Sequence, residues 1–428
     1  MSIKRLKYFL FFSFFFLLSS TFIQGQIQIA SPYSRFGIGD MSDNNNAWNS
    51  SMGEIGIGLR SNYHVNYSNP ASYTAFDSTS FLFEGGAMAT SVTLNSNLQS
   101  ATRNYATLGY IVFGMPVTKW WRTSLGLLPF SDVGYNVENI DDVAGIGNVN
   151  RFYSGSGGIN RFYWGNGFKI GKNLSIGFNA SYLFGSMVRE AKAIFPDSIY
   201  FSNIKEDNYI TVSDIYFTYG LQYQFKLKKD IRMTAGAVFS TNSAVGAKAD
   251  MLAYTFFLGS SGTEYPKDTI QQTTATKGTI LIPAMFGFGL SCENPDKWLV
   301  GADFRWQNWK KFKAFDLSDS LVNSFQVNAG AELLPNINSY TNYLKRIRYR
   351  LGFLYNSTYL ELRGKHLNEY AFTIGFGLPL RGVKTMLNVG AQVGSRGTTE
   401  DNLIKESYFK FIIGFSIYER WFVKRKYY

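Results

Sequence analysis

The chain has 428 residues and a formal net charge of +12, and 17% of its residues are aromatic while only 17% are charged. Its single cysteine, Cys292, excludes an internal disulfide framework. No internal run reaches the ~20 apolar residues of a transmembrane helix, so the 45% hydrophobic content is spread out, as alternating β-strands spread it.

Residues 1–25 have the features of a secretory signal peptide. Three basic residues precede an apolar run from Tyr8 to Ile23, and Gly25 is a suitable small residue before a cleavage site. The alternative is an uncleaved anchor helix, which the shortness of the run disfavours. Export argues against nucleic acid as the partner of the basic surplus, so anionic lipid head groups or an anionic path through a lumen fit better.

Residues 26–76 show no sustained period of two. Prolines and glycines between Pro32 and Pro70 argue against strands that span a bilayer. The aromatic residues of this segment favour packing against another part of the protein. We therefore expect an N-terminal plug, or hatch, of residues 26–76; the alternatives are a periplasmic extension and a disordered leader.

From residue 77 to residue 428 the chain is a succession of candidate strands. There are fourteen, and an even number is what a bacterial single-chain barrel requires. The candidate strands are 79–93, 103–116, 120–137, 152–170, 173–194, 207–227, 230–258, 268–292, 297–311, 321–335, 346–358, 367–379, 384–396 and 406–422.

The candidate strands alternate between an apolar face and a small or polar face. In 406–422 the odd positions from Phe409 to Ile417 are apolar, whereas Lys410, Gly414 and Ser416 lie on the other face. Closure into a barrel removes the strand edges that lipid would not tolerate. The sequence thus predicts an all-β fold, a transmembrane antiparallel β-barrel of about fourteen strands with an N-terminal plug.

This alternation also predicts how substitutions act. We expect arginine at lipid-facing Phe411 to cost about 2–4 kcal/mol near the bilayer midplane, and arginine at lumen-facing Asn179 to cost much less.

The connections alternate between short and long, as periplasmic turns and outer loops do. Residues 138–151 and 195–206 are predicted to be long outer loops, and the long tenth connection, 336–345, breaks the rule. Tryptophans near strand ends are expected to form two interface girdles. The girdle residues are Trp120, Trp121, Trp298, Trp421 and Phe422 at the short-turn side, and Trp306 and Trp309 at the opposite rim.

Several stretches of the chain match a known family. They are Asn69-Pro70-Ala71, Gly155 to Ser186, Gly330 to Pro335 with Tyr349 to Gly352, Ser31 to Asp40, and Glu419 to Arg425. Together they resemble the FadL family of outer-membrane transporters of hydrophobic compounds. The opening, Ser31 to Asp40, and the ending, Glu419 to Arg425, look like the Bacteroidetes branch of that family, which also contains PorV-like accessory subunits of secretion machines.

The resemblance implies a plugged barrel in which hydrophobic ligands bind near the plug and leave sideways through a kink in the third strand. We therefore predict passive uptake of hydrophobic small molecules, fatty-acid-like or aromatic, with lateral release. The alternative is an accessory or structural subunit of an outer-membrane secretion or assembly machine. The expected location is the bacterial outer membrane, and the expected partners are its lipid, a hydrophobic ligand and possible proteins of an outer-membrane complex.

If the chain is a transporter, its ligand should lie between plug aromatics and the inner wall. Ordinary packing of the plug against the wall is the alternative for each residue. The candidate ligand-binding residues are Phe36, Ile38, Trp48, Ile55 and Tyr63, with Arg35, His64 and Asn69 for a polar head group.

A proline inside the third candidate strand predicts a lateral gate, because proline has no N–H for the strand ladder. Asp132 should then point inward or into the gap. The alternatives are that Pro129 ends the strand at the outer rim, or that Pro283 in the eighth strand is the break. The candidate gate residues are Pro129, Phe130, Ser131, Asp132 and Gly134.

No catalytic, cofactor or metal motif stands out, so we expect no enzyme, cofactor or metal site. The glycine-rich Gly155–Gly158 lies in a candidate strand with no following helix, which argues against a phosphate loop. A barrel enzyme such as a lipase or deacylase would need a serine beside one of the two histidines, His64 and His366.

Overall fold

The computed structural model describes residues 29–42, 45–197, 200–228, 230–295, 297–339, 341–380 and 384–420. The predicted signal peptide and the predicted girdle residues Trp421 and Phe422 lie outside these residues. Among the residues described, no helix has the length and hydrophobicity that a bilayer-spanning helix needs.

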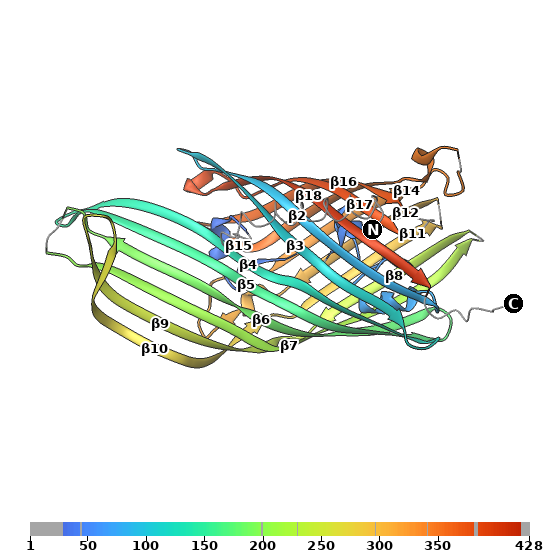
Figure 1. Cartoon of the computed structure of the whole chain (residues 1–428), viewed down its shortest axis with the longest axis horizontal. Helices are drawn as coiled ribbons and strands as arrows, with labels where there is room; N and C mark the ends of the chain where they lie inside the picture. The colour runs from blue at the N-terminus through green and yellow to red at the C-terminus, as the bar shows by residue number, and fades with distance from the viewer. Residues whose placement is uncertain are drawn as a thin grey trace, which may run out of the picture.

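The chain folds into a closed antiparallel β-barrel with fourteen wall strands, which confirms the predicted fold class (Figure 1). Pairing of β18 with β2 closes the ring. Two of the fourteen wall strands consist of two segments each: β8 and β9 form one wall strand, and β10 and β11 form the other. The strands are β2 (Ser80–Asn95), β3 (Ser100–Pro116), β4 (Trp121–Val143), β5 (Gly147–Ile170), β6 (Leu174–Ile194), β7 (Asn203–Lys228), β8 (Ile231–Ser240), β9 (Ser243–Leu258), β10 (Glu264–Ile282), β11 (Met285–Asn294), β12 (Trp298–Gln307), β14 (Ser324–Leu333), β15 (Arg348–Leu362), β16 (Lys365–Pro379), β17 (Met386–Arg396) and β18 (Lys405–Arg420).

Short elements complete the described chain. Four of them belong to the segment before β2, and the rest lie in the connections of the wall. They are η2 (Pro32–Arg35), β1 (Asp40–Met41), α2 (Ala47–Ser50), η3 (Pro70–Ala75), η4 (Trp309–Lys311), β13 (Lys313–Ala314), η5 (Tyr343–Arg346) and η6 (Glu400–Asn402). The long tenth connection is present, and η5 lies in it.

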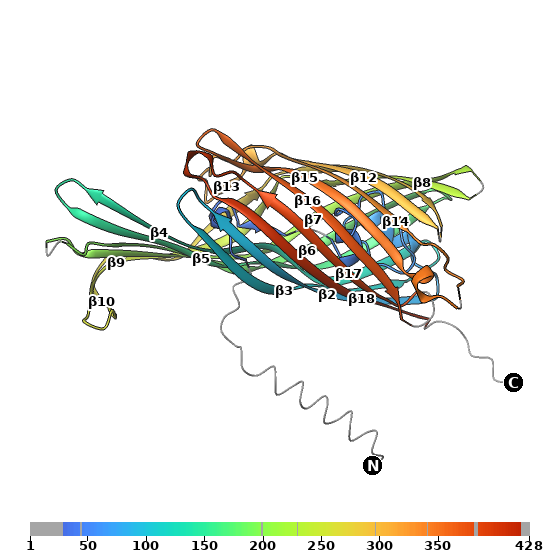
Figure 2. The ribbon, with the colours of Figure 1, turned by 90° about the horizontal axis from the view of Figure 1, so that it is seen from above.

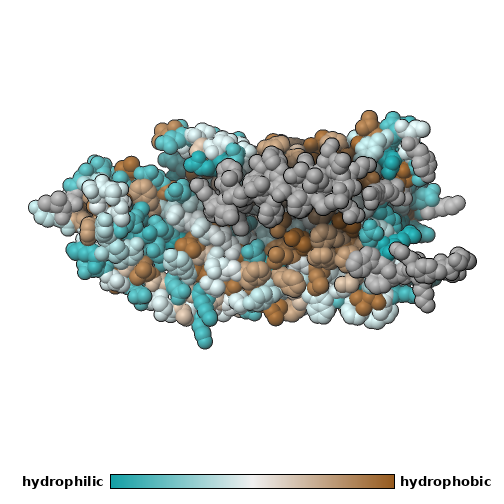
Figure 3. All heavy atoms as spheres, in the orientation of Figure 1, coloured by the Kyte–Doolittle hydropathy of each residue, from teal (hydrophilic) through white to brown (hydrophobic). Residues whose placement is uncertain are grey.

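The alternation of the sequence corresponds to the two faces of the wall. Phe409, Phe411 and Ile413 of β18 are each at least 40% exposed on the outside, whereas Ile412 between them is 2% exposed. Apolar residues gather around one part of the barrel, and one end of the molecule is mostly hydrophilic (Figure 3). An outward apolar band of this kind is the signature of an outer-membrane barrel.

The segment before β2, residues 29–42 and 45–76, lies inside the ring of strands (Figure 2), and we call it the N-terminal segment. Asp303 of β12 accepts hydrogen bonds from the backbone N–H groups of Gly56 and Ile57, at 2.6 and 2.7 Å. Three strands away in the ring, Gln222 of β7 donates to the carbonyl of Ile57 at 2.9 Å. Hydrogen bonds from separate wall strands therefore hold the segment in place.

The wall is far longer on one side than on the other. β5 and β7 have 24 and 26 residues, whereas β12 and β14 have 10 each. A tilted strand of about 9–11 residues already spans a bilayer. The outer parts of β4, β5, β6, β7, β9 and β10 therefore project beyond the bilayer as one sheet (Figures 1 and 2), which we call the outer sheet.

The outer sheet corrects the sequence prediction for one connection in full and for another in part. Residues 138–143 and 147–151, expected to be loop, belong to β4 and β5, and residues 203–206 belong to β7, whereas residues 195–202 lie between β6 and β7 as expected. Their charged and apolar residues alternate poorly because this sheet has water on both faces, so the period of two is weak. Gly157 of β5 and Gly185 of β6 both have positive φ. A Cβ atom on either residue would lie 2.2 Å from a carbonyl oxygen of the neighbouring strand, so only glycine fits at these two positions.

We predict that Phe411→Arg lowers the free energy of unfolding by about 2–4 kcal/mol, because the charge would face lipid.

The sequence predicts that arginine at Asn179 is tolerated, and this prediction is wrong. The Asn179 side chain is hydrogen-bonded to Tyr73 Oη at 2.9 Å and to the Tyr67 carbonyl at 3.3 Å. Asn179→Arg should destabilise the barrel as well. Urea unfolding in lipid vesicles measures both, with Phe411→Leu as control; a stable Asn179→Arg protein would mean that the lumen is open there.

Candidate functional site

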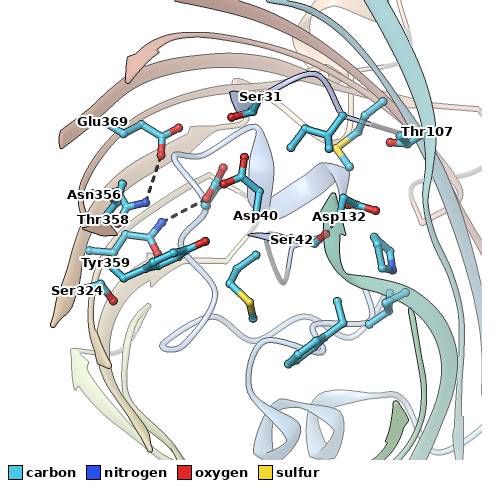
Figure 4. A pocket seen from close by; sticks show the side chains of 18 of the residues that line it. Ser31, Asp40, Ser42, Thr107, Asp132, Ser324, Asn356, Thr358, Tyr359 and Glu369 are labelled. Carbon is cyan, nitrogen blue, oxygen red and sulfur yellow. Dashed lines mark hydrogen bonds between the residues drawn. The ribbon is translucent and has the colours of Figure 1, made fainter. Parts of the chain in front are cut away.

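A cavity of about 600 Å³ lies between the N-terminal segment and the wall. Figure 4 shows β1, carrying Asp40, between Asp132 of β4 on one side and the wall with Asn356, Tyr359 and Glu369 on the other. Residues from most of the wall strands and from the N-terminal segment line it. This volume is in the range of small-molecule sites.

The wall beside this cavity is split between β3 and β4. The two strands pair over six positions, from Ile111 opposite Leu127 to Pro116 opposite Arg122. Beyond Ile111, β3 pairs with β2 alone, up to Ser100. From Leu128 outward, β4 pairs with β5 on its other side. The two strands therefore diverge where β4 enters the outer sheet.

An irregularity marks each side of the split. In β4 the register slips between Pro129 and Ser131, so that Phe130 is an extra residue. In β3 a similar slip leaves Gly109 extra between Leu108 and Tyr110. Bulges bend strands and end their pairing, which accounts for the divergence at this level.

The structure brings the predicted gate residues together at the split. Phe130 is 6% exposed and packs edge-on against Tyr216, with ring centroids 5.7 Å apart. Asp132 faces the cavity and accepts a hydrogen bond from Ser42 Oγ at 3.0 Å. The alternative that Pro129 ends its strand is wrong, because β4 continues to Val143. Gly134 bonds the N-terminal segment through both its N–H and its carbonyl.

The rival break at Pro283 is also real, but it lies elsewhere. Residues 283–284 separate β10 from β11, opposite the interruption between β8 and β9. There β8 pairs with β11 and β9 pairs with β10, so the ladder between neighbouring wall strands continues on either side of the interruption. This break changes the course of the wall without separating its strands.

None of the eight candidate ligand residues lines the cavity. Trp48 and Ile55 pack with Met52, Leu59 and Leu299 in a buried cluster, and Trp48 stacks on His64 at 4.8 Å. Arg35 is exposed, with its guanidinium over the rings of Phe36 and Tyr153. The others pack in the N-terminal segment: Ile38 against the wall, Tyr63 edge-on to His64 and under Arg348, and Asn69 against the Ile57 carbonyl.

Residues that the sequence did not single out make most of the cavity wall. Tyr105 of β3, Arg305 of β12, Glu369 of β16 and Lys410 of β18 all line it. One sequence signal could have found these cavity residues: charged side chains at inward-facing positions near the outer ends of strands. Their parity places them inside, but no sequence pattern indicates how high the N-terminal segment rises in the lumen.

A buried ion cluster lies on the short-turn side of the cavity. Glu332 of β14 accepts from Arg348 Nη1 at 2.6 Å and from Arg350 Nε at 2.7 Å, and all three residues are less than 10% exposed. Trp48 Nε1 donates to the same carboxylate at 3.2 Å. The cluster therefore joins the N-terminal segment to β14 and β15.

An ion pair at the short-turn end fixes the chain just before β2. Asp77 accepts from Lys384 Nζ at 2.6 Å and from Tyr418 Oη at 2.7 Å. Partial burial raises the pKa of Asp77, but these two hydrogen bonds and the charge of Lys384 outweigh it and hold that pKa below its usual value.

Neither histidine has the arrangement of a serine–histidine–acid triad. Ser357 Oγ lies 3.1 Å from His366 Nε2, but the Nδ1 of His366 lies 3.2 Å from the Leu360 carbonyl and not from a carboxylate. Ser416 Oγ at 3.1 Å and Glu84 Oε1 at 2.9 Å both approach the same atom, His64 Nδ1. A serine–histidine–acid triad needs the two ring nitrogens separately. Within the described ranges, no group of three or more His, Cys, Asp or Glu side chains is placed to hold a metal ion.

A family model described as BamG matches residues 3–428, nearly the whole chain. The chain belongs to the BamG family. No protein among the curated sequences matches it. The proposed Bacteroidetes branch and PorV-like character stay predictions.

Solved structures share its fold. The Pseudomonas putida toluene transporter TodX is 15% identical with a TM-score of 0.56, over 90% of this chain and 99% of that one. The Ralstonia pickettii toluene transporter TbuX is 13% identical with a TM-score of 0.56, over 87% and 98%. A Pseudomonas aeruginosa FadL homologue is 11% identical with a TM-score of 0.55, over 89% and 99%.

We predict that Glu332→Gln lowers the free energy of unfolding by about 3–5 kcal/mol, because it leaves two buried arginines without their carboxylate. Urea unfolding followed by gel mobility measures this. The control is Glu361→Gln, which neutralises an exposed carboxylate on β15. Equal stability of the two variants would show that the cluster contributes little.

Proposed function

We propose that this barrel takes up hydrophobic small molecules passively and releases them sideways into the membrane between β3 and β4. The observation that carries the proposal is that the cavity reaches the split. Its lining includes Thr107 and Leu108 on the β3 side and Leu127, Pro129 and Phe130 on the β4 side. The similar fold of two toluene transporters supports the same substrate class.

The contents of the lumen favour a sideways exit. Below the cavity, the N-terminal segment contacts the backbone of the wall itself. A Cβ at Gly330 would lie 2.1 Å from the Met52 carbonyl oxygen, and one at Gly352 would lie 2.0 Å from Gly53 N. A molecule moving toward the short-turn end would have to displace these contacts, whereas the split borders the cavity directly.

The chemistry of the cavity suits an apolar molecule that carries a polar group. Met88, Leu108, Leu127 and Phe130 supply an apolar side near the split. The opposite side has Arg305, whose guanidinium makes no hydrogen bond or ion pair with any residue in the described part of the chain. Apolar surfaces discriminate weakly between similar hydrocarbons, so polar contacts would set the preference.

We predict that a cross-link over the split stops uptake. Thr107→Cys and Phe130→Cys in a Cys292→Ser background place one thiol on each strand, and a bis-maleimide joins them. Uptake of radiolabelled naphthalene and oleate by expressing cells is the measurement, and it should fall to the level of cells without the protein.

The matched control joins Ser395→Cys to Ser407→Cys, which are paired on β17 and β18 away from the split. Uptake should persist in it. Full uptake through a barrel cross-linked at β3 and β4 would rule out this exit.

The outer sheet favours a second candidate function, that of an accessory subunit in an outer-membrane complex. Its tip exposes a stacked pair, Phe257 and Tyr265, at 54% and 47%, with ring centroids 5.3 Å apart. Tyr200 and Phe201 in the neighbouring turn are also exposed. Exposed aromatic surface beyond the bilayer is typical of protein–protein contacts.

If docking is the function, purification from native membranes in mild detergent should yield a stoichiometric partner. The double variant Phe257→Asp/Tyr265→Asp should lose that partner, because charge would enter its aromatic surface. The lipid-facing variant Phe409→Leu is the control and should keep it. A lone barrel with bound lipid would argue for transport instead.

We also infer that export removes residues 1–25, which sequencing of the mature N-terminus checks.

A further inference from the structure

The edge of β4 that the split exposes is covered by the N-terminal segment. In β1, Asp40 pairs with Asp132 and Met41 with Ser131. The backbone N–H of Ser42 donates to the Phe130 carbonyl at 3.0 Å. The segment thus takes the place on β4 that β3 leaves.

A second contact extends this cover outward. The Ser31 N–H donates to the Gly134 carbonyl at 2.8 Å, and the Gly134 N–H donates to Ser34 Oγ at 3.0 Å. Between Phe130 and Gly134, the backbone of β4 therefore has a partner on both sides. An edge strand without such cover would expose its backbone groups to the cavity.

Side chains of other wall strands also hold the same segment: Tyr359 and Arg189 donate to its Gly39 and Gly37 carbonyls, and Arg396 makes the charged contacts. Arg396 of β17 forms a two-pronged pair with Asp40, at 2.9 and 2.7 Å, and its Nε bonds Glu406 of β18 at 2.8 Å. Ser31 Oγ accepts from Arg396 at 2.7 Å and donates to Glu406 at 2.6 Å. The side chains of the three charged residues are at most 15% exposed.

We propose that residues 31–42 are the bar of the lateral exit and that Arg396 is the latch that holds the bar in place. A molecule in the cavity passes the split after β1 leaves β4, and the Asp40–Arg396 pair sets how often β1 leaves. This inference rests on the proposed uptake function. Arg396 is a positioning residue, because it acts on the exit through β1.

Charge-assisted, two-pronged bonds are among the strongest that side chains make. In contrast, β1 has two residues and pairs with a single strand edge. The few backbone bonds of β1 are therefore the weaker attachment, and the latch is the charged contact that keeps Asp40, and with it β1, on β4. Removing the latch should raise the opening frequency without changing the wall strands.

The first test locks the bar. Because Ser42 and Phe130 share a hydrogen bond, Met41 and Ser131 form the adjacent, non-hydrogen-bonded pair, whose Cα atoms lie about 4.5 Å apart. This spacing suits a disulfide. Met41→Cys/Ser131→Cys in the Cys292→Ser background should lose naphthalene uptake on oxidation and regain it on reduction. Full uptake in the oxidised state would overturn the bar.

The second test needs no transport. Ser131 is fully buried under β1, so the alkylation rate of a lone cysteine at Ser131→Cys reports how often the bar leaves. Arg396→Gln should raise that rate about tenfold, a change that corresponds to about 1.4 kcal/mol. Arg396→Lys should restore part of the protection. The control is Arg363→Gln, at an exposed arginine of the β15–β16 turn.

A second variant covers the case in which Arg396→Gln does not fold. Asp40→Asn cuts the latch from the segment side and should give the same acceleration. Unchanged alkylation in both latch variants would overturn the latch.

If the bar test leaves uptake intact while the β3–β4 cross-link stops it, the bar fails and the exit stands. If neither affects uptake, the proposed function fails, and the alkylation rates still decide the latch.

Discussion

The structure depends on one constraint: an irregular backbone buried in a barrel must find a partner for each of its peptide groups. The turns and short helices of the N-terminal segment satisfy part of these groups, and the wall supplies partners for others. Asp303 accepts hydrogen bonds from two N–H groups of the segment, Gln222 donates to two of its carbonyls, and Asn328 donates to the Glu54 carbonyl. The polar inner face of the barrel is therefore the complement of a buried chain rather than the lining of a water-filled pore.

The same constraint explains the glycines of the inner face. Where wall and segment meet backbone to backbone, no side chain fits between them. A Cβ at Gly236 would lie 2.1 Å from the Ile57 carbonyl oxygen, and Gly330 and Gly352 are as close to Met52 and Gly53. These contacts hold the segment at one depth, so the space that remains in the lumen is the cavity on its other side.

The sequence predicted the wall strands well because lipid imposes a strict period of two, as the run from Phe409 to Ile417 shows. It failed where both faces of a strand meet water, as in residues 138–151. It also indicated the split, because Pro129 is a local signal. The cavity was not predictable: the carboxylates of Asp40, Glu369 and Glu406 come from distant parts of the chain, and only the height of the N-terminal segment makes them neighbours.

The split and the outer sheet have one structural cause. β3 ends its pairing with β4 at Ile111, whereas β4 and β5 continue together to the turn at residues 144–146. A strand that joins the outer sheet has to leave the cylinder, and the bulge at Phe130 lets it do so. Consequently β4 borders the split on one edge and belongs to the outer sheet on the other. A molecule bound to the outer sheet would thus act on the strand that borders the proposed exit, so the two proposed functions would not be mechanically independent.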